Sequence, residues 1–451
     1  MSETVTTSQQ ELAGKYKPYP EYKDSGLEWL GEIPAHWNIS RIKYVAQLNP
    51  SKSEVRGLSD DTIVSFIPME AIGERGEIDV SRTRLLGDVL TGYSYITDGD
   101  VILAKITPCF ENGKGAVVHG LENGIGFATT EVIPARPYRK CDAQFLYYLF
   151  TSNPFKALAE GSMYGAGGQK RVADSFVAEY HFAEAPTDER ENIAAFLDYE
   201  TAQIDRLIAH QQRLIELLKE KRQALISHAV RTRPGEGHIK LAYAINLLTG
   251  YPFASSGFKS AKDTHIPLLR GANVGVDQIK WDDVVYWDSE DCSHLDDYYL
   301  ECGDIVFGMD RPWISSGARV AEITQHDTPC LLLQRVARIR AKANHFQTYI
   351  KLCLSSNEFR NYVEADLTGV SVPHISPDQI KGFLIRNLPY DEQVSVTKEV
   401  LQALEKLNAV ERAAFNAIEL LQERRTALIS AAVTGKIDLR GWEPPAEEVA
   451  A

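Results

Sequence analysis

Residues 217–230 read LLKEKRQALISHAV, and residues 420–433 read LLQERRTALISAAV. The second stretch repeats the first at an offset of 203 positions (420 − 217), and the same offset continues without a gap back to Pro186 and Pro389. Each of these prolines is followed by an Asp-Glu pair, which is typical of a helix start. Pro234 and Gly435 follow the two copies, where helices commonly stop. The repeat therefore predicts two matched helices, over residues 186–233 and 389–436.

Apolar residues recur along both predicted helices at heptad spacing, over about 30 residues in each copy. One such helix alone would be interpreted as an ordinary amphipathic core helix, but two copies in phase favour packing against each other within the chain. Polar residues such as Glu200 and Gln211 interrupt the seam, so neither copy suits a homodimeric zipper. The domain inserted between the copies favours an antiparallel pair. The predicted seam residues are Leu197, Ile204, Leu207, Leu214, Leu218, Leu225, Val400, Leu407, Val410, Leu421 and Leu428.

The segments that precede the helices also repeat, more faintly. GDVIL at residues 99–103 matches GDIVF at 303–307, an offset of 204 (303 − 99). Apolar runs punctuated by Gly, Pro, Asn and Asp indicate strands and turns. The expected fold class is α+β, with two mixed, strand-rich domains joined by two long antiparallel helices as a coiled-coil spacer in a pseudo-two-fold internal repeat. The expected boundaries are a disordered leader 1–20, domains 21–185 and 234–388, helices 186–233 and 389–436, and a C-terminal tail 437–451.

Length and composition limit the class of protein. A chain of 451 residues is long enough for about two to four domains. The net charge of −14 is unfavourable for a nucleic-acid binder, but phosphate affinity depends on a local basic face and not on the total. The six cysteines form no CxxC pattern, which favours reduced thiols. No signal segment or membrane span is found in the sequence, so we expect a cytoplasmic protein.

The sequence offers no complete catalytic motif. Residues 387–390 (NLPY) and 152–155 (SNPF) are near misses of the [DNS]PP[YF] motif of amino-methyltransferases, and no cofactor loop accompanies either. Residues 165–168 (GAGG) lack the GK[ST] of a P-loop, and no metal-ligand spacing is found. Asp100 and Lys105 flank an apolar strand, as in PD-(D/E)xK nucleases, but the second acid is missing. We therefore expect no catalysis, no metal and no cofactor in this chain.

Three stretches carry a resemblance to a known family. YKDSGLEWLGEIPAHWNISRIKYV (residues 22–45) resembles the N-terminus of Type I restriction-modification specificity (S) subunits. LLKEKRQALISHAV and LLQERRTALISAAV resemble the repeated regions of that family, and GYPFASSGFKS (residues 250–260) resembles the start of its target-recognition domains. The match runs in order from about residue 20 to residue 442.

The resemblance implies a function and a set of partners. Each strand-rich domain would be a target-recognition domain that reads one half of a split, asymmetric target in double-stranded DNA. The paired helices would set the spacer between the half-sites and dock two methyltransferase (M) subunits, which carry S-adenosylmethionine. Two restriction/motor (R) subunits, which use ATP and Mg, would complete a restriction enzyme. The specificity subunit itself is not catalytic in this family. The residues that touch bases are the variable part of the family, so the resemblance does not assign them.

Candidate DNA contacts follow from the chemistry of base and phosphate recognition. The turn-rich loops that follow the two matched strands are polar, equivalent in position and different in sequence, as two readers of different half-sites require. A further equivalent pair of segments lies shortly before the two helices. The predicted DNA-binding residues are Lys105, Thr107, Asn112, Lys114, Gln169, Lys170, Arg171, Arg270, Asn273, Arg311, Trp313, Ser315, Ser316 and His374. The basic pairs Lys221-Arg222 and Arg424-Arg425 are expected to face a partner or DNA.

Two alternatives remain open on the sequence alone. A structural scaffold could bind protein through its heptad helices and never touch DNA. A self-contained methyltransferase is disfavoured by the missing cofactor loop. The salt dependence of binding distinguishes a DNA reader from a scaffold, because phosphate contacts weaken steeply as salt rises.

Overall fold

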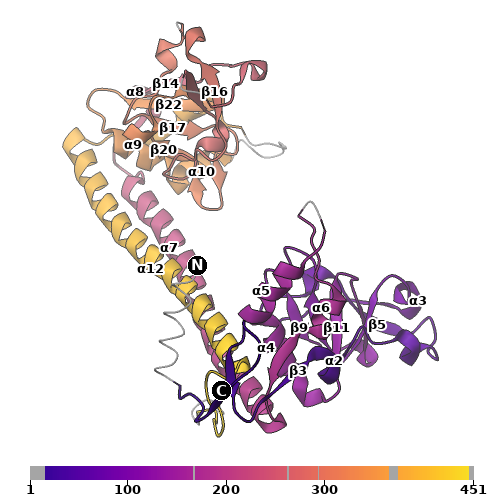
Figure 1. Ribbon diagram of the computed structural model, residues 1–451. Coiled ribbons are helices and arrows are strands. Elements are labelled where there is room, and N and C mark those ends of the chain that lie inside the picture. The colour runs from indigo at the N-terminus through magenta and orange to yellow at the C-terminus, as the bar shows by residue number, and fades with distance from the viewer. Residues whose placement is uncertain (1–15, 166–167, 262–263, 293, 365–373, 446–451) are drawn as a thin grey trace. The chain divides into compact units, whose positions relative to one another are not determined.

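The computed structural model describes residues 16–165, 168–261, 264–292, 294–364 and 374–445 (Figure 1). The chain divides into two compact units. Unit 1 comprises Met1–His210 and Ala417–Ala451, and unit 2 comprises Gln211–Asn416. Each unit contains one strand-rich domain and one half of each of two long helices. This confirms the predicted fold class, in which two mixed, strand-rich domains are combined with two long helices.

The two long helices are α7 (Thr187–Val230) and α12 (Tyr390–Val433), each of 44 residues (Figure 1). In unit 1 the first half of α7 lies against the second half of α12, where Arg425 Nε is 3.3 Å from Asp205 Oδ1. In unit 2 the second half of α7 lies against the first half of α12, where Arg222 Nη1 donates to Asn408 Oδ1 at 2.5 Å. The two helices therefore run antiparallel. The two contacts occupy equivalent positions of the repeat, because both 408 − 205 and 425 − 222 equal 203.

The side chains that the helices bury differ in part from the predicted seam. Leu197, Ile204, Leu218, Val400 and Leu428 are buried, and Leu225, Leu407 and Leu421 are half-buried. The prediction is wrong for Leu207, Leu214 and Val410, which are 48%, 36% and 44% exposed. Ile208 and Ile215 are buried instead. In α7 these two buried residues each lie one position after a predicted seam residue. The buried face of the helix is wider than a two-helix seam, because it also packs on a strand-rich domain.

The two domains share one sheet topology. A four-stranded sheet has the order β4-β11-β8-β9 in unit 1 and β14-β22-β17-β20 in unit 2. All neighbouring strands in both sheets are antiparallel. The strands of unit 1 are β4 (Ala46–Leu48), β8 (Val101–Ala104), β9 (Gly115–Val117) and β11 (Val132–Pro137). Those of unit 2 are β14 (Ile245–Thr249), β17 (Ile305–Gly308), β20 (Val320–Glu322) and β22 (Val336–Ala341).

A second sheet in each domain contains a parallel pair. In unit 1 its order is β6-β5-β10-β7, formed by β5 (Ile63–Ile67), β6 (Thr83–Leu85), β7 (Ser94–Thr97) and β10 (Ile125–Ala128). In unit 2 its order is β16-β15-β21, formed by β15 (His265–Leu269), β16 (Val285–Asp288) and β21 (Leu331–Leu332). The parallel pairs are β5 with β10 and β15 with β21. The repeat seen faintly in the sequence therefore extends to strand order and direction.

Short two-stranded pairings and short helices complete the domains. The pairs are β1 (Tyr22–Asp24) with β2 (Glu32–Pro34), β3 (Asn38–Arg41) with β12 (His181–Glu184), β13 (His238–Lys240) with β23 (Leu384–Arg386), and β18 (Trp313–Ile314) with β19 (Gly317–Ala318). The short helices of unit 1 are α2 (Ile42–Val45), α3 (Leu86–Val89), α4 (Ala143–Thr151), α5 (Asn153–Ser162) and α6 (Asp174–Glu179). Those of unit 2 are α8 (Leu241–Ala244), α9 (Gln347–Leu354), α10 (Asn357–Glu364) and α11 (Pro377–Gly382).

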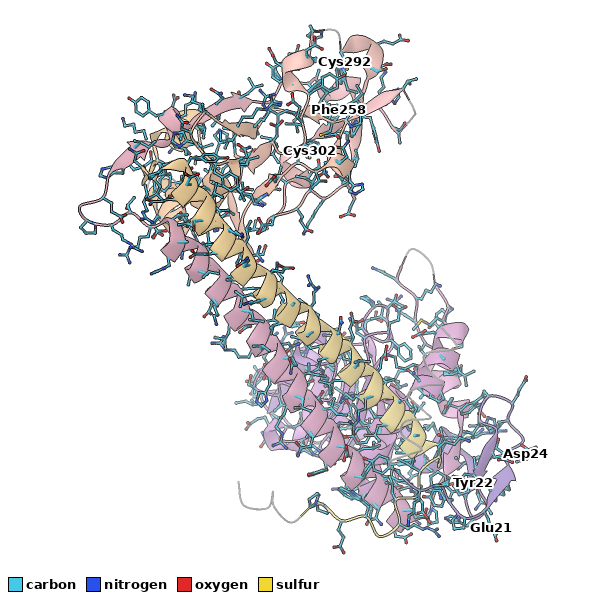
Figure 2. The ribbon with its side chains drawn as sticks, turned by 90° about the vertical axis from the view of Figure 1, so that its left-hand side faces the viewer. Glu21, Tyr22, Asp24, Phe258, Cys292 and Cys302 are labelled. Carbon is cyan, nitrogen blue, oxygen red and sulfur yellow. The ribbon has the colours of Figure 1, made fainter. Side chains whose placement is uncertain are left out.

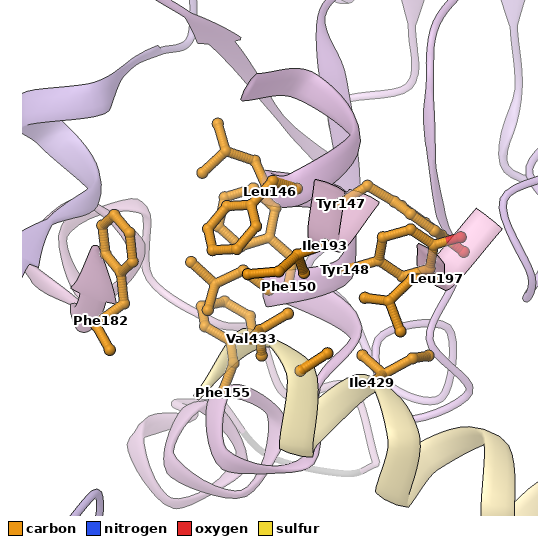
Figure 3. Packing of buried hydrophobic residues seen from close by; sticks show 14 of the residues in the cluster. Leu146, Tyr147, Tyr148, Phe150, Phe155, Phe182, Ile193, Leu197, Ile429 and Val433 are labelled. Atoms are coloured by element: carbon orange, nitrogen blue, oxygen red, sulfur yellow. The ribbon is translucent and has the colours of Figure 1, made fainter. Parts of the chain in front are cut away.

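Each domain is attached to the repeated phrase by a pair of short helices. In unit 1, Ile429 and Val433 of α12 lie in one apolar cluster with Leu146 and Phe150 of α4 (Figure 3). At the start of α5, the backbone N–H of Asn153 donates to Ser430 Oγ at 3.2 Å. In unit 2 the N–H of Asn357, at the start of α10, donates to Ser227 Oγ at 2.8 Å. In both units the serine of the repeated phrase thus accepts a hydrogen bond from a backbone N–H in the first turn of a short helix, where such groups have no partner within the helix.

The ends of the chain contradict part of one expectation. Residues 1–15 of the expected disordered leader lie outside the described residues. Tyr19, however, is buried and donates from its hydroxyl to Glu189 Oε2 at 2.9 Å, and the Tyr16 ring packs edge-on against Phe196. For residues 16–20 the prediction is wrong, because two aromatic side chains have apolar surface to bury against the start of α7. Beside them, Tyr22, labelled in Figure 2, donates from its hydroxyl to the carbonyl of Gly435 at 3.1 Å.

Candidate DNA interface

A buried aspartate precedes the matched strand in each domain. Asp100 is 1% exposed; it accepts hydrogen bonds from the backbone N–H of Thr97 at 2.8 Å and from Arg136 Nε at 2.7 Å. Asp304 accepts from the N–H of Glu301 at 2.8 Å and from Arg340 Nη2 at 2.9 Å. The hydrogen bonds that Arg136 donates to the Asp100 carboxylate raise the pKa of Arg136 further above its usual value. These carboxylates hold the strand that carries each loop, so Asp100 is a structural residue and not part of a nuclease site.

In unit 1 the predicted loop, residues 105–114, folds as a helical turn. The N–H of Phe110 donates to the carbonyl of Ile106 at 2.9 Å, and that of Asn112 to Pro108 at 3.0 Å. The Phe110 side chain is 1% exposed and anchors the turn in the core. The loop is therefore pre-ordered, which reduces the entropy lost when such a loop binds a ligand.

The same loop is joined to the second predicted segment of unit 1. The Thr107 hydroxyl donates to the carbonyl of Gly168 at 2.7 Å and accepts from the N–H of Lys170 at 3.0 Å. The N–H of Thr107 donates to the carbonyl of Lys170 at 3.0 Å. Residues 105–114 and 168–171, more than 50 positions apart in the sequence, thus form one continuous surface.

Several of the predicted side chains of unit 1 are already engaged within the protein. Lys105 Nζ is 3.7 Å from Asp174, Asn112 Nδ2 donates to Glu74 at 3.0 Å, and Lys114 Nζ donates to the carbonyl of Met69 at 3.1 Å. Arg171 forms a bidentate pair with Glu131, at 2.8 and 2.9 Å, and these hydrogen bonds lower the pKa of Glu131. Within the described part of the chain, only Gln169 and Lys170 of this predicted set are exposed and have no side-chain partner.

In unit 2 the equivalent loop has a different conformation. Residues 313–318 form a β-hairpin in which β18 pairs with β19, and Ser315 and Ser316 are exposed at its tip. Arg311 precedes the hairpin with a φ of 44°, and its side chain is exposed. The Trp313 ring lies 6.2 Å from that of Phe359, so this side chain anchors the hairpin on the domain. Two domains with the same strand order therefore present loops of different shape.

His374 and Asp310 join the two predicted segments of unit 2. His374 Nδ1 is 2.7 Å from Asp310 Oδ1, and Arg335 Nη1 donates to the same carboxylate at 3.0 Å. Burial alone would raise the pKa of Asp310, but the hydrogen bonds from His374 and Arg335 outweigh it and lower that pKa. His374 stands at the position equivalent to Arg171, which pairs with Glu131. The rest of this predicted segment, residues 368–373, lies outside the described residues.

Two further predicted residues serve the fold. Asn273 is 2% exposed; its side-chain amide donates to the carbonyls of Lys280 and Asp283 and accepts from the N–H of Arg270. A side chain buried in this way cannot reach a base, so the prediction of a DNA contact is wrong for Asn273. Arg270 is paired with Asp283, at 2.8 Å. The sequence shows an Arg and an Asn in one turn, but it does not show that the Asn273 side chain is used for hydrogen bonds to the backbone of that turn.

Two basic side chains next to the hairpin of unit 2, Lys219 and Arg360, were not among the predicted residues. A cleft of about 380 Å³ is lined by Trp313, Ser315 and Ser316 and also by Lys219, Arg222 and Arg360. The run KEKR at residues 219–222 was the available signal, but it was assigned to Lys221 and Arg222. Arg222 and its counterpart Arg425 point into the helix pairs, where they contact Asn408 and Asp205. The expectation that the two basic pairs face a partner or DNA stays a prediction.

The described residues contain no group of three or more His, Cys, Asp or Glu side chains placed to hold a metal ion. None of their helices combines the length and the apolar character that a membrane span needs. All six cysteines are free thiols, among them Cys292 and Cys302, which Figure 2 labels.

Comparison with solved structures identifies the class of fold. A chain from a structure that describes the complex assembly and conformational transition of the type I R-M system aligns with a TM-score of 0.73, covering 90% of this chain and 99% of that chain at 18% identity. The HsdS subunit from Thermoanaerobacter tengcongensis aligns with a TM-score of 0.53, covering 90% and 98% at 17% identity. The two strand-rich domains and paired helices therefore have the fold of HsdS subunits.

Comparison with curated sequences identifies the family. The specificity subunit of the Type I restriction enzyme EcoAI from Escherichia coli is 30% identical over 88% of this chain and 82% of that protein. The specificity subunit of the enzyme MjaVIII from Methanocaldococcus jannaschii is 23% identical over 93% and 97%. No protein-family model matches. The chain belongs to the family of Type I restriction enzyme specificity subunits. It confers specificity and is not itself an enzyme.

Proposed function

We propose that each strand-rich domain reads one half of a bipartite DNA target and that the paired helices set the spacer between the halves. One observation carries this proposal. The two domains share one strand order, β4-β11-β8-β9 and β14-β22-β17-β20, but present different loops at the end of the matched strand. A common frame with two different reading loops suits recognition of two unlike half-sites, because specificity comes from side chains at base edges.

The proposed partners are double-stranded DNA, two methyltransferase subunits and, in the restriction form of the complex, two restriction subunits. S-adenosylmethionine, ATP and Mg would be bound by those subunits. The repeat supports two docking sites for identical partners. Leu207 and Val410, at equivalent positions, are 48% and 44% exposed, and Leu217 and Leu420 are 45% and 65% exposed. Exposed apolar side chains repeated in this way suit a partner that binds twice.

The proposal is tested by mapping methylated adenines in the source genome with and without this gene. We expect the gene to be required for methylation at one split motif, with two short specified halves separated by an unspecified spacer. Methylation that is unchanged when the gene is deleted would contradict the proposal. A scaffold that binds only protein would leave the map unchanged and would show no steep salt dependence of DNA binding.

Lys170 provides a test of one half-site. Lys170→Ala should weaken binding of the assembled methyltransferase complex to its target, because this exposed ammonium stands on the ordered loop surface of unit 1. The expected loss is roughly 1–3 kcal/mol if Lys170 contacts a base, with relaxed preference in one half of the target. Arg311→Ala in unit 2 is the matched variant and should relax the other half. Equal relaxation of both halves by either variant contradicts the assignment of one domain to one half-site.

A further inference from the structure

Each domain has a short hairpin that follows the parallel strand of its second sheet. In unit 1 it is closed by the bridge between Ile72 and Ile78, and in unit 2 by the bridge between Val274 and Ile279. The hairpins directly follow two equivalent turns, Met69–Ala71 and Gly271–Asn273. Arg75 and Asp277 both lie near the tips of these hairpins. The two hairpins are thus the same structural element, and each carries a charged residue of opposite sign near its tip.

In unit 1 the hairpin reaches both long helices through one carboxylate. Arg75 Nη1 is 3.4 Å from Asp205 Oδ1 on α7, and Arg425 Nε on α12 is 3.3 Å from the same oxygen. The three side chains are 30%, 26% and 14% exposed. One aspartate on the helix therefore lies between an arginine of the hairpin and an arginine of the partner helix.

In unit 2 the carboxylate is on the hairpin instead. Asp277 pairs with Arg222 on α7 and with Lys351 on α9, whose Nζ is 3.2 Å away. Arg222 also donates to Asn408 on α12, at 2.5 Å. The hairpin again reaches both helices through one side chain, but here that side chain is an arginine of α7.

The repeat relates the two clusters position by position. Arg425 corresponds to Arg222 and Asp205 to Asn408, both at the offset of 203, and Arg75 and Asp277 lie near the tips of the two corresponding hairpins. Both clusters contain the helix arginine, Arg425 or Arg222. The carboxylate lies on the helix in unit 1, as Asp205, and on the hairpin in unit 2, as Asp277. If the hairpin of unit 1 met the helix cluster of unit 2, Arg75 would face Arg222 and Asn408 with no carboxylate between them. If the hairpin of unit 2 met the helix cluster of unit 1, Asp277 would face Asp205.

We propose that this hairpin–helix cluster positions each recognition domain on the helices and that its opposite polarity matches each domain to its own end of the helix pair. Half-buried ion pairs of this kind contribute modest stability, but like charges placed at a close contact reject a mismatched arrangement. The cluster therefore acts on the orientation of the reading loops and not on base contacts. This inference rests on the proposed function, since it concerns how the reading domains are held.

The test gives the cluster of unit 1 the same arrangement of charges as the cluster of unit 2. Arg75→Asp alone places two carboxylates against one arginine and should misorient the domain. Arg75→Asp combined with Asp205→Asn reproduces the Asp-Arg-Asn set of unit 2 and should restore it. The measurement uses the full chain assembled with its methyltransferase subunits. It compares the affinity for a duplex that carries the mapped target with the affinity for the same duplex with its spacer changed by one base pair.

We expect the single variant to reduce the ratio of these two affinities about tenfold and the double variant to return it to within about twofold of the wild type. If the single variant does not assemble, rescue of assembly by the double variant is the supporting result. Arg82→Asp, which breaks an exposed ion pair with Glu70 on the same domain, is the control for a change of charge and should leave the ratio unchanged.

Two outcomes overturn the inference: a double variant no better than the single variant, or a single variant with the wild-type ratio. A wild-type complex that shows no preference for the mapped target contradicts the proposed function instead. The two failures are therefore distinguishable in one set of measurements.

Discussion

Inserting four helix-forming residues into both long helices should lengthen the accepted DNA spacer by one to two base pairs. The insertions belong between His210 and Gln211 and between Asn416 and Ala417, where the two units divide, because every contact inside each unit is then retained. Four residues add about 6 Å of rise and about 40° of rotation. One base pair of B-DNA adds about 3.4 Å and about 35°, so the rotation matches one base pair and the rise matches two. Mapping methylated adenines for the lengthened chain measures the spacer directly.

The control is an insertion of two residues at the same two places. It adds only about 3 Å but rotates the helices by about 200°, which should abolish recognition of any split target. Both insertions should leave the two half-site sequences unchanged wherever methylation is retained. A four-residue insertion that leaves the spacer unchanged would falsify the role of the helices in setting it.

Replacing Arg136 by Ala should destabilise unit 1 by about 3 kcal/mol, because it leaves the carboxylate of Asp100 buried without its charged partner. Unfolding of the β4-β11-β8-β9 sheet should then become easier while the sheet of unit 2 is unaffected. Hydrogen–deuterium exchange followed by peptide mass spectrometry should show exchange in β8 and β11 faster by about 100-fold. The loop that follows β8 would lose its support, so on the proposed function the readout of one half-site should weaken.

Arg340→Ala is the matched variant in unit 2, where Arg340 holds Asp304. It should accelerate exchange in β17 and β22 and leave unit 1 protected. Arg82→Ala, which removes one partner of an exposed pair, should change exchange little in either unit. Equal acceleration of both sheets by Arg136→Ala would show that the two units do not unfold independently.

Much of the architecture could be predicted because the repeat can be recognised in the sequence, and it relates segments that are about 200 residues apart. The offset of 203 defined both helices to within a few residues of α7 and α12. Which residues of the helices are buried was less predictable. A heptad pattern assumes one partner, whereas Ile208 and Ile215 are buried in place of Leu207 and Leu214. The sequence alone does not show how wide the buried face of a helix is.

The proposed DNA-contacting surface was harder to predict than the fold. Residue type marks a side chain as able to hydrogen-bond a base, but not as free to do so. Asn273 uses its amide to close its own turn, and Arg171 is held by Glu131. Those internal partners are distant in the sequence or lie in turns of unpredicted geometry. Lys170 remains a candidate because its side chain is exposed and only its backbone is engaged.

The serines of the repeated phrase explain what an exchange of recognition domains would have to preserve. Ser430 and Ser227 each accept the first N–H of a short helix that begins at Asn153 or Asn357. Both short helices begin at the asparagine of a Ser-Asn dipeptide. A foreign domain that carries this dipeptide at the same place would fit the same attachment point without any change to the long helices. On the proposed function, this shared attachment point would allow a new DNA specificity to be acquired by exchange of a whole domain and not only by mutation of single residues.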